Sequence, residues 1–220
     1  MNLSIFEILG PVMIGPSSSH TAGAARLARV AAMIAAKPFD RVQFALHGSF
    51  LKTGVGHGTR LALLAGALGI AEDDERLRQA EALAREKGIR WSFTEAELED
   101  AHENTACITF EHTDGTRSRI TGSSIGGGRI RITEINGMAT DISAEHPTLL
   151  VEQNDVSGVI SEISTALAQA GINIGIMRVG RRARGDLAST ILELDEPVTP
   201  ELAAHLQRLP NVRRVCVINP

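Results

Sequence analysis

The chain has few aromatic side chains and no excess of positive charge, and both shortages exclude a class of function. Aromatic residues make up 3% of the 220 positions, and none of them is tyrosine. The chain therefore offers few side chains on which nucleic-acid bases stack. Its formal net charge of −4 provides no basic field for a phosphate backbone. We expect no nucleic-acid partner, and a metabolite-binding regulator of nucleic acid fits poorly.

Cysteine is also scarce. The two cysteines, Cys107 and Cys216, lie far apart in the sequence, so they form no CxxC motif and are too few to ligate an iron–sulfur cluster alone. Each lies in a strand-like run, and we expect buried structural thiols rather than a disulfide. No group of His, Cys, Asp and Glu residues has the spacing of metal ligands. We therefore expect no metal site in this chain.

Long apolar runs are missing as well. The sequence has no apolar run of the roughly 18 residues that a membrane-spanning helix needs, and its first residues lack a basic stretch followed by an apolar core. We expect a cytoplasmic protein with no membrane partner. A hydrophobic content of 43% and a charged content of 22% are typical of globular proteins. The length allows one large domain or two small ones.

A domain boundary is expected at Glu145–Pro147, because Asn136-Gly137 closes a strand pair before it and Pro147 marks entry to a new strand. We expect domains at 1–145 and 147–220. The second domain has the order βαββαβ, a ferredoxin-like unit. Its expected strands are 148–153, 172–179, 187–194 and 212–218, and its expected helices are 156–170 and 200–209.

The first domain is expected to be mixed α/β. Hydrophobic periodicity and turn signals predict helices at 18–36, 60–68 and 75–87, and strands at 41–46, 105–111, 116–121, 129–135 and 138–142. Residues 122–128, rich in glycine and serine, are expected to form a flexible polar loop between two hairpins. An alternative for Ser123, Ser124 and the glycines that follow is a cradle of backbone amides for a carboxylate.

The run from Gly15 to Gly23 is the most informative motif, because three serines, a histidine and a threonine precede a long helix. A helix N-terminus presents unpaired N–H groups and attracts anions, and a histidine beside it exchanges a proton near neutral pH. The run therefore predicts anion binding and proton transfer in one place. The alternative is an ordinary helix cap. The candidate residues are Ser17, Ser18, Ser19, His20 and Thr21.

A second histidine, His57, lies between two glycines that let the backbone approach a ligand. The segment is no Walker A motif and a poor dinucleotide fingerprint, and a tight turn with an exposed histidine remains the alternative. Because His20 and His57 both precede helices, we expect them to converge. His47-Gly48-Ser49 ends a strand, where ligands often bind in α/β folds. The remaining histidines are expected on the surface: His102, His112, His146 and His205.

In the second domain, the loop between the first strand and the first helix contains Asn154, Asp155 and Gly158. These residues offer donors, acceptors and a close backbone approach for a small ligand. A plain capping loop fits the spacing equally well.

Together these motifs resemble the β chain of iron–sulfur-dependent L-serine dehydratase. The resemblance covers nearly the whole chain, and its last part, 147–220, resembles an ACT domain, an amino-acid-sensing module. The motifs that carry it are Ser4-Ile5-Phe6-Glu7, Gly15-Pro16-Ser17-Ser18-Ser19-His20-Thr21, Gly56-His57-Gly58-Thr59 and Ser124-Ile125-Gly126-Gly127-Gly128.

The resemblance implies a lyase that converts L-serine to pyruvate and ammonia, in amino-acid metabolism and gluconeogenesis. It implies a 4Fe-4S cluster ligated by a separate α subunit, so this chain is expected to act only in a heterodimer. We expect His20 and His57 to be catalytic, without assigning which is the base. Substrate is expected at Ser17, Ser18, Ser19, Thr21 and Ser49.

For the ACT domain, the resemblance implies self-association and an amino-acid effector, with L-serine expected, at Asn154, Asp155, Gly158 and Asn173. The first domain resembles a module that also occurs as an allosteric substrate-binding domain in some phosphoglycerate dehydrogenases. The same fold can bind an anion without chemistry. The alternative function is therefore a non-catalytic amino-acid-binding regulatory protein.

Overall fold

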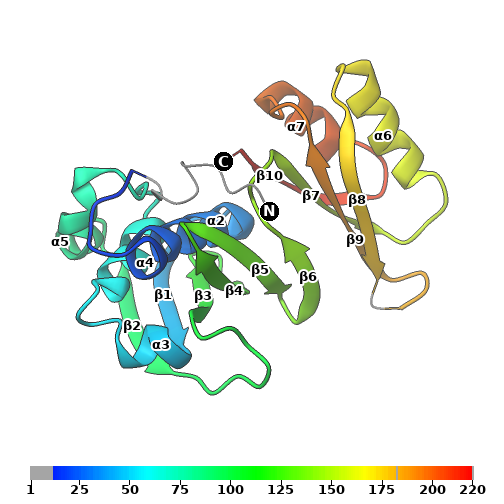
Figure 1. The fold of residues 1–220 in the computed structure, drawn as a ribbon. Helices are drawn as coiled ribbons and strands as arrows, with labels where there is room; N and C mark the ends of the chain where they lie inside the picture. Colours follow the sequence, from blue (N-terminus) through cyan, green and yellow to red (C-terminus); the bar gives the residue numbers. More distant parts are fainter. Residues whose placement is uncertain (1–11, 182, 220) are drawn as a thin grey trace. The chain divides into compact units, whose positions relative to one another are not determined.

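The computed structural model describes residues 12–181 and 183–219. The chain divides into two compact units, the first ending at Ser143 and the second beginning at Ala144 (Figure 1). The motif at residues 4–7 lies outside the described residues. Within the described part of the chain, no helix is long and apolar enough to cross a membrane.

The first unit is built on a six-stranded sheet of order β2-β1-β3-β4-β5-β6, in which only β1 and β2 pair in parallel. β1 buries every second residue, Val42, Phe44 and Leu46, as expected for a strand covered on one face. β2 was not predicted. The strands are β1 (Phe39–Leu46), β2 (Arg90–Glu95), β3 (Thr105–His112), β4 (Arg117–Gly126), β5 (Arg129–Ile135) and β6 (Met138–Ile142).

Helices cover the face of this sheet that carries the apolar side chains. α2 (Ala24–Ala35) packs on β3, β4 and β5, and α4 (Thr59–Ala67) packs against α2 (Figure 1). A π-helical turn, η1 (Ser18–Gly23), leads directly into α2. The short helix α3 (Gly48–Lys52) follows β1 and was not predicted, and the charged segment at 75–87 forms a 3-10 turn, η2 (Glu75–Gln79), and α5 (Ala80–Glu86).

The prediction of a flexible loop at 122–128 is wrong. β4 continues to Gly126 and pairs on both sides, with Ser123 opposite Thr105 on β3 and opposite Arg131 on β5. Glycine and serine favour turns by themselves. Here the hydrogen bonds of two neighbouring strands and burial against η1 override that preference, and Ser124 is fully buried.

The expected surface position of His112 is also wrong. Its side chain is buried, with Nε2 2.8 Å from Ser118 Oγ and Nδ1 3.3 Å from the carbonyl oxygen of Pro38. The cause is strand alternation, which puts Ile108, Phe110 and His112 on the covered face of β3. The other three histidines of that group are exposed, as expected: His102, His146 and His205. Cys107 and Cys216 are buried free thiols, also as expected.

The second unit has the predicted βαββαβ order, in an antiparallel sheet of order β10-β7-β9-β8. The first helix begins three residues later than predicted, because Gly158 adopts a left-handed φ of 96° before it. Leu149 and Val151 of β7 pack with Ile163 of the first helix and Leu206 of the second in one apolar core. The elements are β7 (Thr148–Asn154), α6 (Val159–Gln169), β8 (Ile174–Arg181), β9 (Leu187–Leu194), α7 (Pro200–Gln207) and β10 (Val212–Ile218).

Candidate functional site

The serine-rich motif starts the helix in an unusual way. Ser17 is extended (φ −142°, ψ 125°), and its Oγ accepts a hydrogen bond from the His20 amide at 3.1 Å. The Ser17 carbonyl oxygen accepts from Thr21 N at 2.9 Å and from Ala22 N at 3.3 Å, which opens the first turn to π-helical spacing. Single π-helical turns are rare in proteins, and those that occur are often found at functional sites. Ser17 thus caps the helix, and the wide turn carries Ser18, Ser19 and His20.

His20 is held by the helix that follows β1. Its Nε2 lies 3.0 Å from Ser49 Oγ and 3.0 Å from Thr53 Oγ1, and its ring meets the buried ring of Phe50 edge-on at 5.5 Å between centroids. Burial of the ring lowers the pKa of His20 below 6.5, and the neighbouring His57 lowers it further, against a hydrogen bond to the Ser49 backbone that raises it. Both causes favour the neutral form of the His20 imidazole.

His57 lies in the turn before α4, with its ring exposed. Its Nδ1 is 3.0 Å from the carbonyl oxygen of Thr53, and its own carbonyl oxygen accepts from Thr21 Oγ1 at 3.0 Å. A carbonyl oxygen only accepts, so the neutral His57 ring carries its proton on Nδ1. Its Nε2 then presents a lone pair, which is the form that a general base requires.

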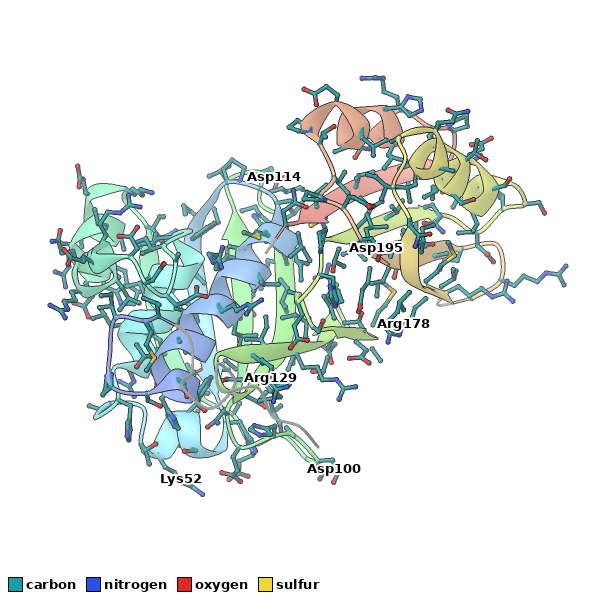
Figure 2. The ribbon with its side chains drawn as sticks, turned by 45° about the horizontal axis from the view of Figure 1, so that its top comes forward. Lys52, Asp100, Asp114, Arg129, Arg178 and Asp195 are labelled. Atoms are coloured by element: carbon teal, nitrogen blue, oxygen red, sulfur yellow. The ribbon has the colours of Figure 1, made fainter. Side chains whose placement is uncertain are left out.

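The structure brings the two histidines together, as expected from the sequence. The ring centroids of His20 and His57 are 4.9 Å apart, with the planes inclined by 37°. The segments that meet here are η1, α3 and the turn before α4. Asp114, in the turn after β3, lies at the opposite end of this unit from Lys52 on α3 (Figure 2). The site is therefore at the end of the sheet where β1 enters α3.

Thr53, which was not predicted as a site residue, contacts both histidines. Its spacing is the available signal, because Thr53 lies four residues after Ser49 and four before His57. The Ser49–Thr53 part of that signal becomes readable only once α3 is known, since residues i and i+4 are neighbours across one helical turn. His47, another candidate, has its Nδ1 3.2 Å from the Leu98 amide and anchors the segment after β2.

β4 packs against η1, and the Ser124 amide on β4 already donates to the Asn104 carbonyl oxygen at 3.0 Å, so it is not free for the carboxylate cradle considered for Ser123 and Ser124. Ser123 Oγ is 2.7 Å from Thr105 Oγ1, and both side chains are buried. A Cβ atom on Gly23 would lie 2.0 Å from Ser124 Oγ. Glycine at position 23 therefore lets η1 approach β4 closely, and these serines support the turn rather than face a ligand.

The candidate ligand residues of the second unit are bonded to their own unit. Asp155 Oδ2 accepts from Arg181 Nη1 at 2.8 Å and from the Gly185 amide at 2.9 Å, and the pKa of Asp155 is lowered by that amide and by Arg181. Asn154 bonds to Asn211 and Arg213. The cavity beside them measures about 440 Å³ and is lined by Glu152, Asn154, Gly185, Asp186, Leu187 and Arg213.

Asn173 is not near that loop within one chain. It donates from Nδ2 to Asp195 Oδ2 at 2.7 Å, beside the pairing of Ile174 with Leu194. Asn154 pairs with Leu187, at the other end of β9. The register thus separates Asn173 from Asn154 by the length of the sheet. Gly158 has open space around the position of a Cβ atom.

The described residues offer no cluster of side chains suited to binding a metal ion. Among residues 12–181 and 183–219, no three His, Cys, Asp or Glu side chains are grouped so that they could hold an ion. Cys107 belongs to the first unit and Cys216 to the second, and burial raises the pKa of the Cys216 thiol to about 11.

The fold and the site define a two-unit protein that joins a histidine–hydroxyl site on a mixed sheet to a βαββαβ unit. Residues 4–134 match the family described as serine dehydratase beta chain, and residues 147–211 match the ACT domain. The chain belongs to the serine dehydratase beta chain family and carries an ACT domain at its C-terminal end.

Relatives of two kinds are found. A protein of Bacillus subtilis (strain 168) named "Probable L-serine dehydratase, beta chain" is 43% identical over 98% of this chain and 97% of its own length. The "L-serine dehydratase, beta chain" of Peptoniphilus asaccharolyticus is 40% identical over 90% of each chain. A D-3-phosphoglycerate dehydrogenase of Bacillus subtilis is 28% identical over 83% of this chain but only 35% of its own length. Similar sequence thus also occurs as part of a different enzyme.

Proposed function

We propose that this chain is the β subunit of an L-serine dehydratase, which forms pyruvate and ammonia from L-serine together with an α subunit. The observation that carries the proposal is the pair of imidazoles 4.9 Å apart in a chain of the serine dehydratase beta chain family. β-Elimination needs a base for the weakly acidic α-proton. The electron pair of the Cα–H bond forms the C=C bond as hydroxide leaves, and hydrolysis of the resulting enamine's imine tautomer releases ammonia.

His57 is the proposed base. Its Nδ1–H donates a hydrogen bond to the Thr53 carbonyl oxygen, so Nε2 is the acceptor, and the exposed ring is open to a substrate bound at a subunit contact. His20 is the proposed orienting and binding group, because its Nε2 is already engaged by two hydroxyls. In these roles one ring accepts a proton and the other donates a hydrogen bond.

The serine-rich turn is the proposed carboxylate site. Ser18 and Ser19 lie at the wide mouth of the helix, where free N–H groups attract an anion. Ser17, Thr21 and Ser49 support the site through bonds to His20 N, His57 O and His20 Nε2.

The 4Fe-4S cluster that the resemblance implies does not fit the residues of this chain. Such clusters take about four cysteine thiolates, and this chain has two cysteines, buried in different units. The cluster is therefore proposed to belong to the α subunit. The β chain alone is then expected to be inactive. We propose that the assembled enzyme works in the cytoplasm.

Reconstitution of the enzyme from its two chains tests this proposal. The pure β chain is expected to show no serine turnover, and mixing it with a candidate α chain and iron under anaerobic conditions is expected to produce pyruvate. Turnover of serine by the pure β chain would contradict the two-chain proposal.

The ACT unit is proposed to self-associate and to sense an amino acid, with L-serine as the first candidate. β8 is an edge strand with one partner, and Ile176, Met177 and Val179 on it are exposed. Pairing two copies along β8 offers a way to bring Asn173 of one copy toward the Asn154–Gly158 loop of the other. Calorimetry of the full chain with L-serine is expected to give binding heat, and Gly158→Val is expected to remove the part of that heat that belongs to the ACT unit. A folded, self-associated chain without heat at millimolar serine would limit the unit to assembly.

A non-catalytic amino-acid-binding protein is the second candidate. The relatives named D-3-phosphoglycerate dehydrogenase favour it, because there the similar segment is about a third of an enzyme with another name. Reconstitution separates the two: binding of serine without pyruvate formation in the presence of every tested α chain would support the regulatory protein.

A further inference from the structure

Thr53 connects the two histidines through two different atoms. Its side-chain Oγ1 is 3.0 Å from His20 Nε2, and its main-chain carbonyl oxygen is 3.0 Å from His57 Nδ1. The residue directly follows α3, where the backbone turns toward the His57 loop. The neighbouring Lys52 side chain points away from the unit (Figure 2), so Thr53 alone of this pair faces the imidazoles. Thr53 therefore contacts both rings, His20 through its side chain and His57 through its main chain.

The direction of each hydrogen bond follows from which atoms are able to donate. Thr53 Oγ1 is also 3.0 Å from the carbonyl oxygen of Ser49, which has no proton to give. The Thr53 hydroxyl proton is therefore used in that bond. Toward its other two neighbours, Ser49 Oγ at 3.2 Å and His20 Nε2 at 3.0 Å, Thr53 Oγ1 acts as the acceptor.

The protonation of His20 follows in the same way. If Thr53 Oγ1 accepts, then the proton of the His20 ring lies on Nε2, and the Ser49 hydroxyl points at Thr53 Oγ1. This arrangement gives every contact among His20 Nε2, Ser49 Oγ and Thr53 Oγ1 a donor and an acceptor. The opposite arrangement would leave two lone pairs facing each other at 3.0 Å, between Thr53 Oγ1 and His20 Nε2.

We infer that Thr53 is a positioning residue that sets complementary tautomers on the two rings, Nε2–H on His20 and Nδ1–H on His57. His57 Nε2 is thereby left as the acceptor and His20 Nε2 as a donor. The assignment of tautomers stands on the hydrogen bonds alone, whereas its effect on catalysis rests on the proposed function.

The tautomers are measurable in the full β chain without any partner. Long-range ¹H–¹⁵N correlation spectra of chain labelled in its histidine rings are expected to show Nε2–H for His20 and Nδ1–H for His57 at pH 8. The reverse pattern on either ring in the wild-type chain would overturn the inference, with no variant needed.

Thr53→Val removes the hydroxyl and keeps the shape and the carbonyl oxygen. The Ser49 hydroxyl then loses its acceptor and turns to His20 Nε2, so His20 is expected to shift toward Nδ1–H while His57 stays unchanged. Thr53→Ser keeps the hydroxyl and is expected to retain the wild-type tautomers. Thr94→Val, the same replacement at an exposed position of β2, controls for lost stability. An unchanged His20 in folded Thr53→Val would contradict the inference.

The catalytic consequence is measured in enzyme reconstituted with the α chain. Thr53→Val is expected to lower kcat by about five- to tenfold with little change in KM, because the loss is of ring positioning rather than of substrate contact, and Thr53→Ser is expected to restore most of it. If the tautomer shifts and kcat does not, the histidine roles in the proposed function fail while the inference about Thr53 stands.

Discussion

The two units use clustered polar side chains in different ways. In the first, His20, Thr53 and His57 meet from three segments and leave the Nε2 edge of an exposed imidazole facing outward. In the second, Asn154 and Asp155 are satisfied by Arg181, Gly185, Asn211 and Arg213 of the same unit. Both loops are rich in polar residues by sequence. What separates a reactive cluster from a structural one is whether a donor or acceptor is left over after the protein's own bonds are counted.

The largest expected effect comes from removing a histidine of the first unit. His57→Ala and His20→Ala in the reconstituted enzyme are each expected to lower turnover, by roughly 100- to 10,000-fold where the general base is lost. His205→Ala, on the exposed surface of α7 in the second unit, is the matched control and should keep the wild-type rate. Turnover and gel filtration are measured together, so that lost assembly is distinguished from lost chemistry. A near wild-type rate in the double variant would remove both histidines from the mechanism.

The second test concerns the close approach of η1 to β4. Gly23→Ala would set a Cβ atom 2.0 Å from Ser124 Oγ, and we expect a loss of about 1–3 kcal/mol in the free energy of unfolding. Without a collision, alanine would stabilise the helix relative to glycine. A decrease in the free energy of unfolding would therefore show that the new Cβ atom collides with Ser124. Urea unfolding measures it, and adding Ser124→Gly is expected to recover part of the loss.

Gly180→Ala in the second unit is the control for that test, because no heavy atom lies within 4 Å of the added Cβ position. Equal unfolding midpoints for Gly23→Ala and the wild-type chain would show that η1 tolerates a side chain there.

The third test asks whether the second unit self-associates through its edge strand β8. Val179→Arg puts a charge on the edge strand β8, where Val179 is 54% exposed, and charged edge strands resist pairing. Sedimentation velocity over a range of concentrations is expected to show a dissociation constant raised by about tenfold or more. Ala204→Arg, at an exposed position of α7 in the same unit, serves as control. Identical behaviour of the two variants would place the contact elsewhere.

The smallest expected effect is on pH dependence. Burial and His57 lower the pKa of His20 below 6.5, so the unfolded chain binds a proton there more readily than the folded one. The associated stability is complete above pH 6.5 and is lost as pH falls through the folded pKa. His20→Ala is expected to flatten this part of the stability profile, measured by thermal unfolding between pH 5 and 8. A profile unchanged by the substitution would contradict the assignment.

Much of the fold was predictable, and the exceptions share a cause. The strands at 148–153 and 187–194 and the helix at 18–36 carry strong local patterns, and each appears within a few residues of its expected bounds. α3 is too short for a hydrophobic period to identify it, and β2 pairs only at the edge of the sheet. The segment 122–126 becomes a strand because two neighbours pair with it.

The sequence by itself determined which chemistry this chain can carry. Two histidines before helices, a run of hydroxyls and too few cysteines for a cluster are properties of the residues and their order. Only the tertiary structure decided which of these groups act together. Thr53 became a partner of both rings because α3 turns it toward them, and Asp155 became a structural group because Arg181 and Gly185 reach it first. Hydrogen bonds depend on distance and direction in space, and segments far apart in sequence acquire these only when the chain packs.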